Sequence, residues 1–207
     1  TKYENKKDLA KQKEKEATDR QRKAEIKALE AQINPHFLYN TLDTINWMAI
    51  DRDEFDISNA ISALANILRY AITDSNGTVC IRDEIEWLKT YIYLQQFRLT
   101  NKFVRIIEVS PEVLDVKIHK LLLQPFIENS IIHGFKGEQE EYVLEVFISQ
   151  ENTNLVIIIR DNGSGMPQDL VEKVNTGQPI KTEEKSHIGM ENAIMRLNMY
   201  CEGKANI

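Results

Sequence analysis

The chain has 207 residues, of which 42% are hydrophobic and 28% charged, and this composition excludes intrinsic disorder for most of its length. It contains neither a secretory leader nor a run of about 18 apolar residues, so the sequence predicts a soluble chain. The net charge is −6, with +3 over residues 1–32 and −9 over the rest, which argues against a nucleic-acid-binding protein. Because Cys80 and Cys201 lack C-x-x-C spacing and the four histidines are scattered, we expect a reducing compartment and no structural metal.

The first part of the chain is predicted to form two helices. Residues 1–50 contain no glycine and one proline, and a coiled-coil seam is spaced by three, four and three at Ile26, Leu29, Ile33 and His36. Upstream of this seam the pattern is weak, so residues 1–25 are predicted to be a signalling helix that depends on a partner helix. The residues Asp51-Arg52-Asp53 interrupt the pattern, and a second helix follows with apolar positions at Ile57, Ile61, Leu64, Leu68 and Ile72. We expect an antiparallel hairpin over residues 26–78, and two copies would bury their apolar stripes in a dimeric four-helix bundle.

The remaining residues, 79–207, are predicted to form an α/β sandwich, which makes the whole chain α+β. A third helix is expected over 83–99. Short β-type runs follow at 103–109, 142–149 and 155–160, and helical patterns at 117–133, 168–175 and 189–199. This alternation is typical of a sheet covered by helices.

The first segment with chemical potential is the stretch around Pro35-His36. A proline inside a helical pattern removes a backbone donor and destabilises the helix, so a functional hypothesis is a helix loosened to present His36, whose imidazole is a nucleophile near neutral pH. The alternative is a kinked helix with a half-buried histidine. Asn40 lies one turn after His36 on the same face, where its amide reaches anything attached to the imidazole; packing in the bundle is the alternative.

The second segment carries Asn129 and His133, which are four residues apart and share one helical face. An amide oxygen suits Mg²⁺, and an imidazole one turn further can reach a phosphate. A helix with a merely polar edge is an equal alternative.

The third and fourth segments resemble parts of a nucleotide pocket. An apolar strand runs into Asp161, Gly163 and Gly165, placing a carboxylate at a strand end beside backbone that a ligand can approach, although a simple turn explains the same string. Gly189 opens a helix, where free N–H groups favour phosphate. No P-loop and no dinucleotide-binding glycine motif is present.

Taken in order, the four segments resemble the H, N, G1 and G2 boxes of a sensor histidine kinase. The order is more specific than any single box. The string N-P-H-F-L-Y-N-T-L around His36, Leu68-Arg69-Tyr70, and Gln124-Pro125-Phe126-Ile127-Glu128-Asn129 are similar to LytS/YesM-type kinases. The likeness covers about residues 26–201.

The resemblance implies a phosphotransfer hairpin followed by a Bergerat/GHKL-type ATP-binding domain. His36 would accept the γ-phosphate of ATP and pass it to an aspartate of a response regulator. Asn129 would hold Mg²⁺ and Asp161 would accept from the adenine amino group. Backbone and side-chain contacts to the nucleotide would come from His133, Gly163, Gly165, Gly189 and Asn192. The polar stretch 167–186 would be a mobile ATP lid.

The sequence also departs from the family pattern. His187 stands where the first glycine of the G2 box is usual, Phe37 stands where many kinases carry an acid, and the two closing strands after the G2 helix are missing, so we expect a C-terminally truncated domain and name no general base. Two alternatives remain: a non-catalytic dimeric scaffold and a Bergerat-fold ATPase. The ATPase is disfavoured because Pro125 occupies the position of its water-activating glutamate.

Because the chain starts at Thr1 and not at Met, we interpret it as an excised fragment. The resemblance implies the cytoplasmic portion of a bacterial membrane sensor, whose anchor would lie in segments outside this fragment.

Overall fold

The structure is a computed structural model that describes residues 35–73, 77–99, 103–136, 140–168 and 171–172, together with residues 194, 197, 198, 200, 201 and 205. The predicted signalling helix over 1–25 lies outside the described residues. So do most of the expected lid and the two site residues Gly189 and Asn192.

The helical hairpin is confirmed by α2 (Pro35–Ile50) and α3 (Phe55–Ile72). The connection contains Asp53 with φ 58°, a left-handed conformation that aspartate tolerates better than most residues. The buried residues of the two helices are small: Ala49, Ser58, Ala63 and Ala65. The Ser58 hydroxyl donates to Asn46 Oδ1 at 2.6 Å, so the one buried hydroxyl at this interface is satisfied.

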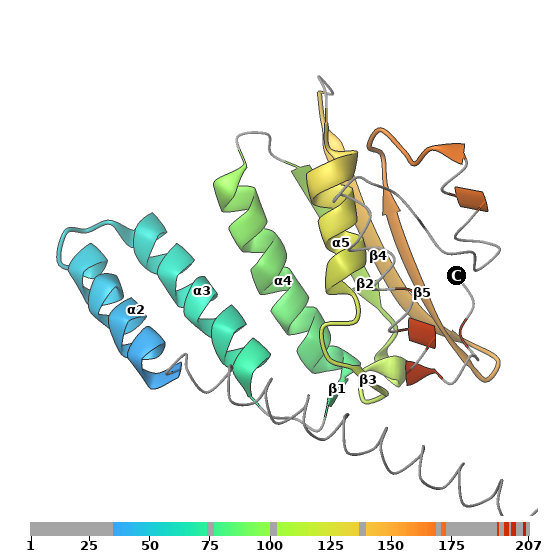
Figure 1. Ribbon diagram of the computed structural model, residues 1–207, viewed down its shortest axis with the longest axis horizontal. Helices are drawn as coiled ribbons and strands as arrows, with labels where there is room; N and C mark the ends of the chain where they lie inside the picture. The colour runs from blue at the N-terminus through green and yellow to red at the C-terminus, as the bar shows by residue number, and fades with distance from the viewer. Residues whose placement is uncertain are drawn as a thin grey trace, which may run out of the picture.

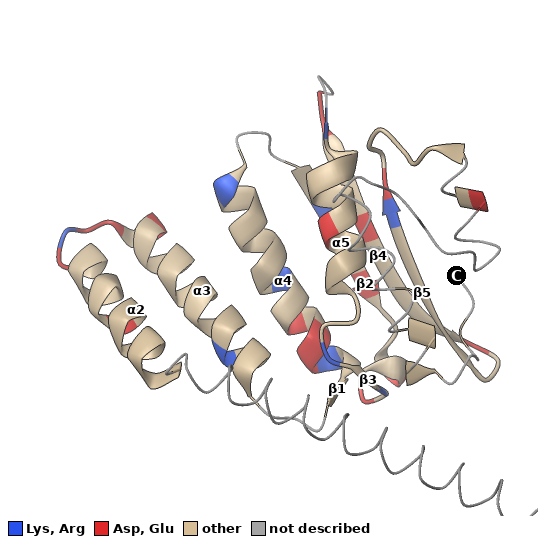
Figure 2. Ribbon diagram, viewed as in Figure 1, with Lys and Arg blue, Asp and Glu red and all other residues tan. Residues whose placement is uncertain are grey.

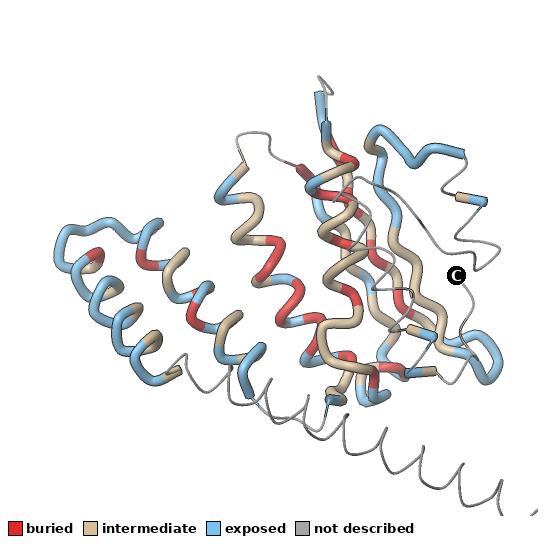
Figure 3. The backbone as a smooth tube through the Cα atoms, in the orientation of Figure 1, coloured by how far each residue is buried: buried red, intermediate tan, exposed pale blue. Residues whose placement is uncertain are grey.

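Helix α4 (Ile81–Arg98) begins two residues before its predicted start. Its buried face combines apolar residues three and four apart, namely Ile81, Ile85, Leu88 and Ile92. Figure 1 shows α4 with α3 on one side and the sheet on the other, and Figure 3 shows its buried face turned inward. Helix α4 therefore joins the hairpin to the α/β region.

The main sheet has three strands, β2 (Phe103–Val109), β4 (Tyr142–Glu151) and β5 (Asn154–Asp161), in the order β2-β4-β5. Strands β2 and β4 are parallel, and β4 and β5 are antiparallel. Alternate residues of β4 are buried at 2% exposure or less, which is the period-2 pattern of a strand with one covered face: Tyr142, Leu144, Val146 and Ile148. These residues form one core with α4 and with Ile127 and Ile131. All three predicted strands are confirmed.

The predicted helix over 117–133 is wrong in its first part. Residues Lys117–His119 form β3, which pairs antiparallel with β1 (Thr78–Cys80), because this pairing buries Ile118. A turn follows in which Leu121 has φ 58°. Helix α5 (Gln124–Glu128) then starts with Pro125 in its first turn, where the missing N–H is least costly. A π-helix, η2 (Asn129–Gly134), continues it, and a short 3₁₀ turn, η1 (Pro111–Val113), precedes β3.

The C-terminal region is described only in part. Residues 168, 171 and 172 are helical, as are 194, 197 and 198, which agrees with the helices predicted over 168–175 and 189–199. Residue 200, one position beyond the second predicted helix, is helical as well. Tyr200 stacks on His119, with ring centroids 3.5 Å apart and an interplanar angle of 12°, so the end of the chain contacts β3. None of the helices in the described part is long and apolar enough to span a bilayer.

Candidate functional site

The predicted phosphoacceptor lies on an exposed face of α2. His36 and Asn40 are both exposed, and the Asn40 amide nitrogen lies 3.3 Å from Nδ1 and 3.4 Å from Nε2 of His36. The helix supports them locally, since Thr41 and Thr44 return their hydroxyls to the carbonyls of Phe37 and Asn40 at 2.7 and 2.8 Å. The alternative of a half-buried histidine is therefore wrong for His36, whereas a kink at Pro35 is not tested because the described residues begin there.

The predicted nucleotide residues converge at the end of β5. Asp161 Oδ2 accepts a hydrogen bond from Ser130 Oγ at 2.7 Å, and its Oδ1 accepts from the backbone N–H of Gly163 at 3.0 Å. A carboxylate has about four acceptor positions, so these two bonds fix its orientation and leave capacity for an amino group of a ligand. Asp161 is exposed, as a group that meets a ligand must be.

Two glycines allow the backbone to close around this carboxylate. A Cβ on Gly163 would overlap the backbone of Gly134, and a Cβ on Gly134 would lie 3.1 Å from Asp161 Oδ1. The Gly134 carbonyl accepts from Ser164 N and Lys136 N, each at 2.9 Å. Gly165 has φ 73° and faces open space. The glycines are thus needed for close approach at 163 and for a left-handed turn at 165.

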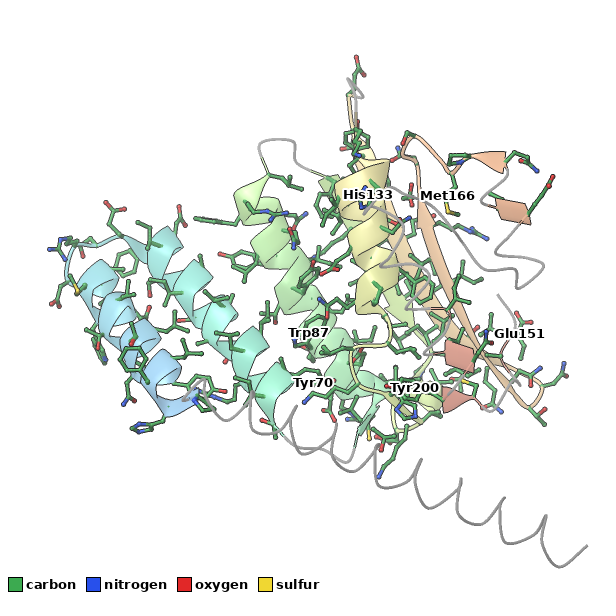
Figure 4. The ribbon with its side chains drawn as sticks, in the orientation of Figure 1. Tyr70, Trp87, His133, Glu151, Met166 and Tyr200 are labelled. Carbon is green, nitrogen blue, oxygen red and sulfur yellow. The ribbon has the colours of Figure 1, made fainter. Side chains whose placement is uncertain are left out.

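The π-helix η2 brings the second predicted segment to the same place. Its wider turn is marked by the bond from Phe135 N to Ser130 O at 3.0 Å. Asn129 and His133 are half-buried on it, and the His133 carbonyl accepts from Ser164 Oγ at 3.4 Å. Figure 4 shows His133 and Met166 at the same end of the α/β region. Single-turn π-helices occur often at functional sites, and here one carries Asn129 and the Ser130 that orients Asp161.

Glu128, which precedes Asn129, makes structural hydrogen bonds to α4 and within α5. Glu128 Oε1 accepts from the Tyr91 hydroxyl at 2.8 Å and from Gln124 Nε2 at 2.7 Å. Burial and the neighbouring Glu128 raise the pKa of Tyr91, so its hydroxyl stays protonated and donates. Glu128 therefore anchors α5 to α4.

Asn129 offers one oxygen ligand for a magnesium ion. In the described residues no group of three or more His, Cys, Asp or Glu side chains forms a metal site. An amide oxygen fits Mg²⁺, which usually takes one or two protein oxygens together with substrate phosphates and waters. The donor at Asn129 thus fits an ion brought by a nucleotide.

His36 and Asp161 are not brought together within this chain. Helix α2 packs on α3, and α3 packs on α4; both α3 and α4 lie between α2 and α5 (Figure 1). Gly189 and Asn192 lie outside the described residues. Sequence reasoning missed Ser130 and Gly134, although each adjoins a residue that it did select.

Comparison with known proteins gives consistent matches. A family model described as histidine kinase matches residues 24–103. The sensor histidine kinase YesM of Bacillus subtilis is 34% identical over 151 residues, which is 73% of this chain and 26% of that protein. The sensor protein LytS of Staphylococcus epidermidis is 30% identical over 184 residues, 87% of this chain and 30% of that protein. This chain therefore spans about a quarter to a third of the length of these relatives.

Among solved structures, a histidine kinase domain from the blue-light activated histidine kinase of Erythrobacter litoralis aligns with a TM-score of 0.43 at 13% identity. The alignment covers 79% of this chain and 84% of that one.

Proposed function

Because the chain belongs to the LytS/YesM family of sensor histidine kinases, we propose that it catalyses the ATP-dependent phosphorylation of His36 and the transfer of that phosphoryl group to an aspartate of a response regulator. The observation that carries the proposal is the contact between Ser130 and Asp161. It joins the segment of Asn129 to the end of β5 and so brings together two segments that are distant in sequence.

In the proposed reaction, a lone pair of a His36 ring nitrogen attacks the γ-phosphorus of ATP. The bond from that phosphorus to the bridging oxygen breaks, and ADP leaves. Phosphoryl transfer depends mainly on positioning and charge neutralisation. Asp161 orients adenine by accepting a hydrogen bond from the adenine amino group. The backbone N–H groups that follow Gly163 and Gly165 lie along the path by which the nucleotide enters.

Magnesium would be held by Asn129 together with the phosphates, where it neutralises charge that develops on the transferred group. His133, one turn further along η2, would contact the phosphates. Gly189 and Asn192 are proposed to complete the phosphate site on the basis of the family resemblance alone.

We further propose that the hairpin dimerises. Large apolar side chains are exposed on both helices: Phe37 (66%), Ile45 (44%), Met48 (49%), Ile57 (46%) and Leu64 (39%). Figure 2 shows that these two helices carry few charged residues between their ends. An uncharged stripe on each of two antiparallel helices is the surface that a four-helix bundle of two copies would bury. The membrane sensor segment and the response regulator are proposed as the remaining parts of the pathway.

Radioactive transfer tests the proposed activity. The intact protein incubated with γ-labelled ATP and magnesium is expected to gain a label that is stable in base and lost in acid, as a phosphohistidine is. An ATPase would release labelled phosphate without labelling the protein, and a non-catalytic scaffold would do neither. Either of these two results would contradict the proposal.

A further inference from the structure

The most deeply buried acid of the described residues is Glu84, in the first turn of α4, with 0% exposure. Its Oε2 accepts from the Tyr70 hydroxyl at 2.8 Å and from Leu121 N at 3.0 Å, and its Oε1 accepts from Leu123 N at 3.5 Å. Burial raises the pKa of this carboxyl, and the hydrogen bonds oppose that rise. Glu84 therefore binds two parts of the chain at once: α3 of the hairpin and the loop before α5.

The loop depends on this carboxylate. Leu121 has φ 58°, an unfavourable conformation for a branched side chain, which persists only where its surroundings impose it. The same loop also contacts the hairpin directly, because Lys120 Nζ donates to Thr73 O at 2.6 Å and to Ala71 O at 3.4 Å. The loop leads into α5 and Asn129 within a few residues.

A second path runs from the hairpin to the same helix through aromatic rings. The Tyr70 ring stacks on Trp87 with centroids 5.8 Å apart, and Trp87 stacks on Tyr91 at 5.2 Å. Tyr91 donates to Glu128, which immediately precedes Asn129. Figure 4 shows Tyr70 and Trp87 beside each other where α3 meets α4. Both paths begin at Tyr70 and end at the residues that position Asn129.

An open groove borders the contact between α3 and α4. A cavity of about 550 Å³ lies along it and is lined by residues that include Asn66, Asp83 and Thr90. The hairpin is also held by Ile67, which packs against the core, and by the bonds from Lys120 to Thr73 and Ala71. A shift of the hairpin would take the Tyr70 hydroxyl from a buried carboxyl group. Leaving a buried acceptor with one hydrogen-bond donor fewer is costly.

We propose that Glu84 is a positioning residue that couples the phosphotransfer hairpin to the nucleotide site: its backbone partners hold the loop that starts the helix of Asn129, and its bond to Tyr70 holds the hairpin against α4. In this docked arrangement α3 and α4 lie between the helix of His36 and the nucleotide region of the same chain (Figure 1). Breaking the bond to Tyr70 weakens the hold of α4 on the hairpin and leaves the loop in place. The inference rests on the proposed kinase function only for its effect on catalysis.

Two variants test separately the bond from Glu84 to the hairpin and the bonds from Glu84 to the loop before α5. Tyr70→Phe removes the hydroxyl and keeps the ring stack. Hydrogen exchange of the backbone amides over residues 67–73 of the 207-residue chain should therefore become about tenfold faster, which corresponds to the free energy of one hydrogen bond to a carboxyl group. ADP affinity should stay within about threefold. Glu84→Gln places an amide N–H₂ where Leu123 N–H needs an acceptor, so exchange should rise at Leu121 and Leu123 as well, and ADP should bind about tenfold more weakly.

Tyr93→Phe is the matched control, because Tyr93 lies on α4 and takes no part in this network. If Tyr70→Phe and Tyr93→Phe give the same exchange rates, the proposed hold on the hairpin is overturned. If Glu84→Gln leaves ADP affinity unchanged, the proposed hold on the loop is overturned.

The kinase assay adds a readout that loss of stability alone would not produce. Tyr70→Phe should raise the maximal rate of His36 phosphorylation with little change in the KM for ATP, whereas Glu84→Gln should raise that KM. A lower maximal rate in Tyr70→Phe would contradict the release of the hairpin. If no variant is phosphorylated while the exchange differences persist, the kinase proposal fails and the coupling stands.

Discussion

The Asn40 amide nitrogen lies at nearly equal distances, 3.3 and 3.4 Å, from the two ring nitrogens of His36. Equal distances place the amide across the imidazole and not in line with one nitrogen. The amide would therefore lie adjacent to a phosphoryl group on either nitrogen, and to a water molecule that attacks a phosphorylated regulator bound at this position.

Replacing His36 by glutamine should abolish autophosphorylation and leave ADP binding unchanged, since the phosphoacceptor and the Asp161 pocket lie on different parts of the fold. Phosphate analysis and calorimetry on the same preparation check both parts. His133→Gln is the informative control, because His133 is the other helix-borne histidine of the site. Label retained on His36→Gln and lost from His133→Gln would reassign the acceptor.

Replacing Asn40 by alanine distinguishes an orienting role from a structural one. If the amide orients water, autophosphorylation and forward transfer should stay near normal while the phosphorylated regulator lives several-fold longer. If Asn40 only packs in the bundle, the melting temperature should fall and all steps should slow together. An unchanged lifetime of the phosphorylated regulator would end the orienting hypothesis.

Replacing Asn129 by alanine should remove the magnesium-dependent part of ATP binding, because the ion loses its amide oxygen. Asp161→Asn should weaken the preference for adenine nucleotides over guanine nucleotides, since an amide can donate as well as accept. Titrations with ATP and GTP, each with and without magnesium, measure both effects. Unchanged values for both variants would place the pocket elsewhere.

Gly163→Ala should destabilise the fold by about 2 kcal/mol or more, because its methyl group would overlap the Gly134 backbone. Gly165→Ala is the matched control: it faces open space at φ 73°, so only backbone strain of about 1 kcal/mol is expected. Urea denaturation of both variants gives the difference. Equal stabilities would mean that residues 134 and 163 are not in close contact.

Glu84 should make stability depend on pH in a defined direction. Burial raises its folded-state pKa above the ordinary 4.5, so between these two values the folded chain binds more protons than the unfolded chain, and the free energy of unfolding falls as pH rises. Tyr70 keeps its proton throughout this range because burial and Glu84 raise its pKa. Subtracting the pH profile of Glu84→Gln from that of the parent chain isolates the effect; parallel profiles would contradict it.

The longer elements were predictable from sequence because each carries its own periodicity. The strand over 103–109 was predicted with its observed bounds, and α3 and α4 within two residues. Strands β1 and β3 were missed because three residues are too few to display alternation, and their pairing joins segments about forty residues apart. Residues 117–123 looked helical because Ile118, Leu121 and Leu122 are spaced like a helical face.

The candidate site residues could be selected from the sequence, but their arrangement could not. Asp161 was selected from its strand end, yet nothing in the sequence indicated that Ser130 would orient it, because that bond depends on the π-helical turn. A π-helix has no pattern of its own in sequence. The burial of Glu84 was equally hidden, since an acid in the first turn of a helix is usually a surface residue.

The parallel pairing of β2 with β4 has a consequence for how the domain folds. Strands β4 and β5 are joined by a tight turn at Asn152 and can pair early, whereas β2 must wait for the connection over 110–141, which contains β3, α5 and η2, to close a long loop. Ser130 lies on that connection, whereas Asp161 lies at the end of β5 in the β4–β5 pair, and the two residues are hydrogen-bonded. The contact between Ser130 and Asp161 is therefore expected to form among the last steps of folding, once β2 has joined the sheet.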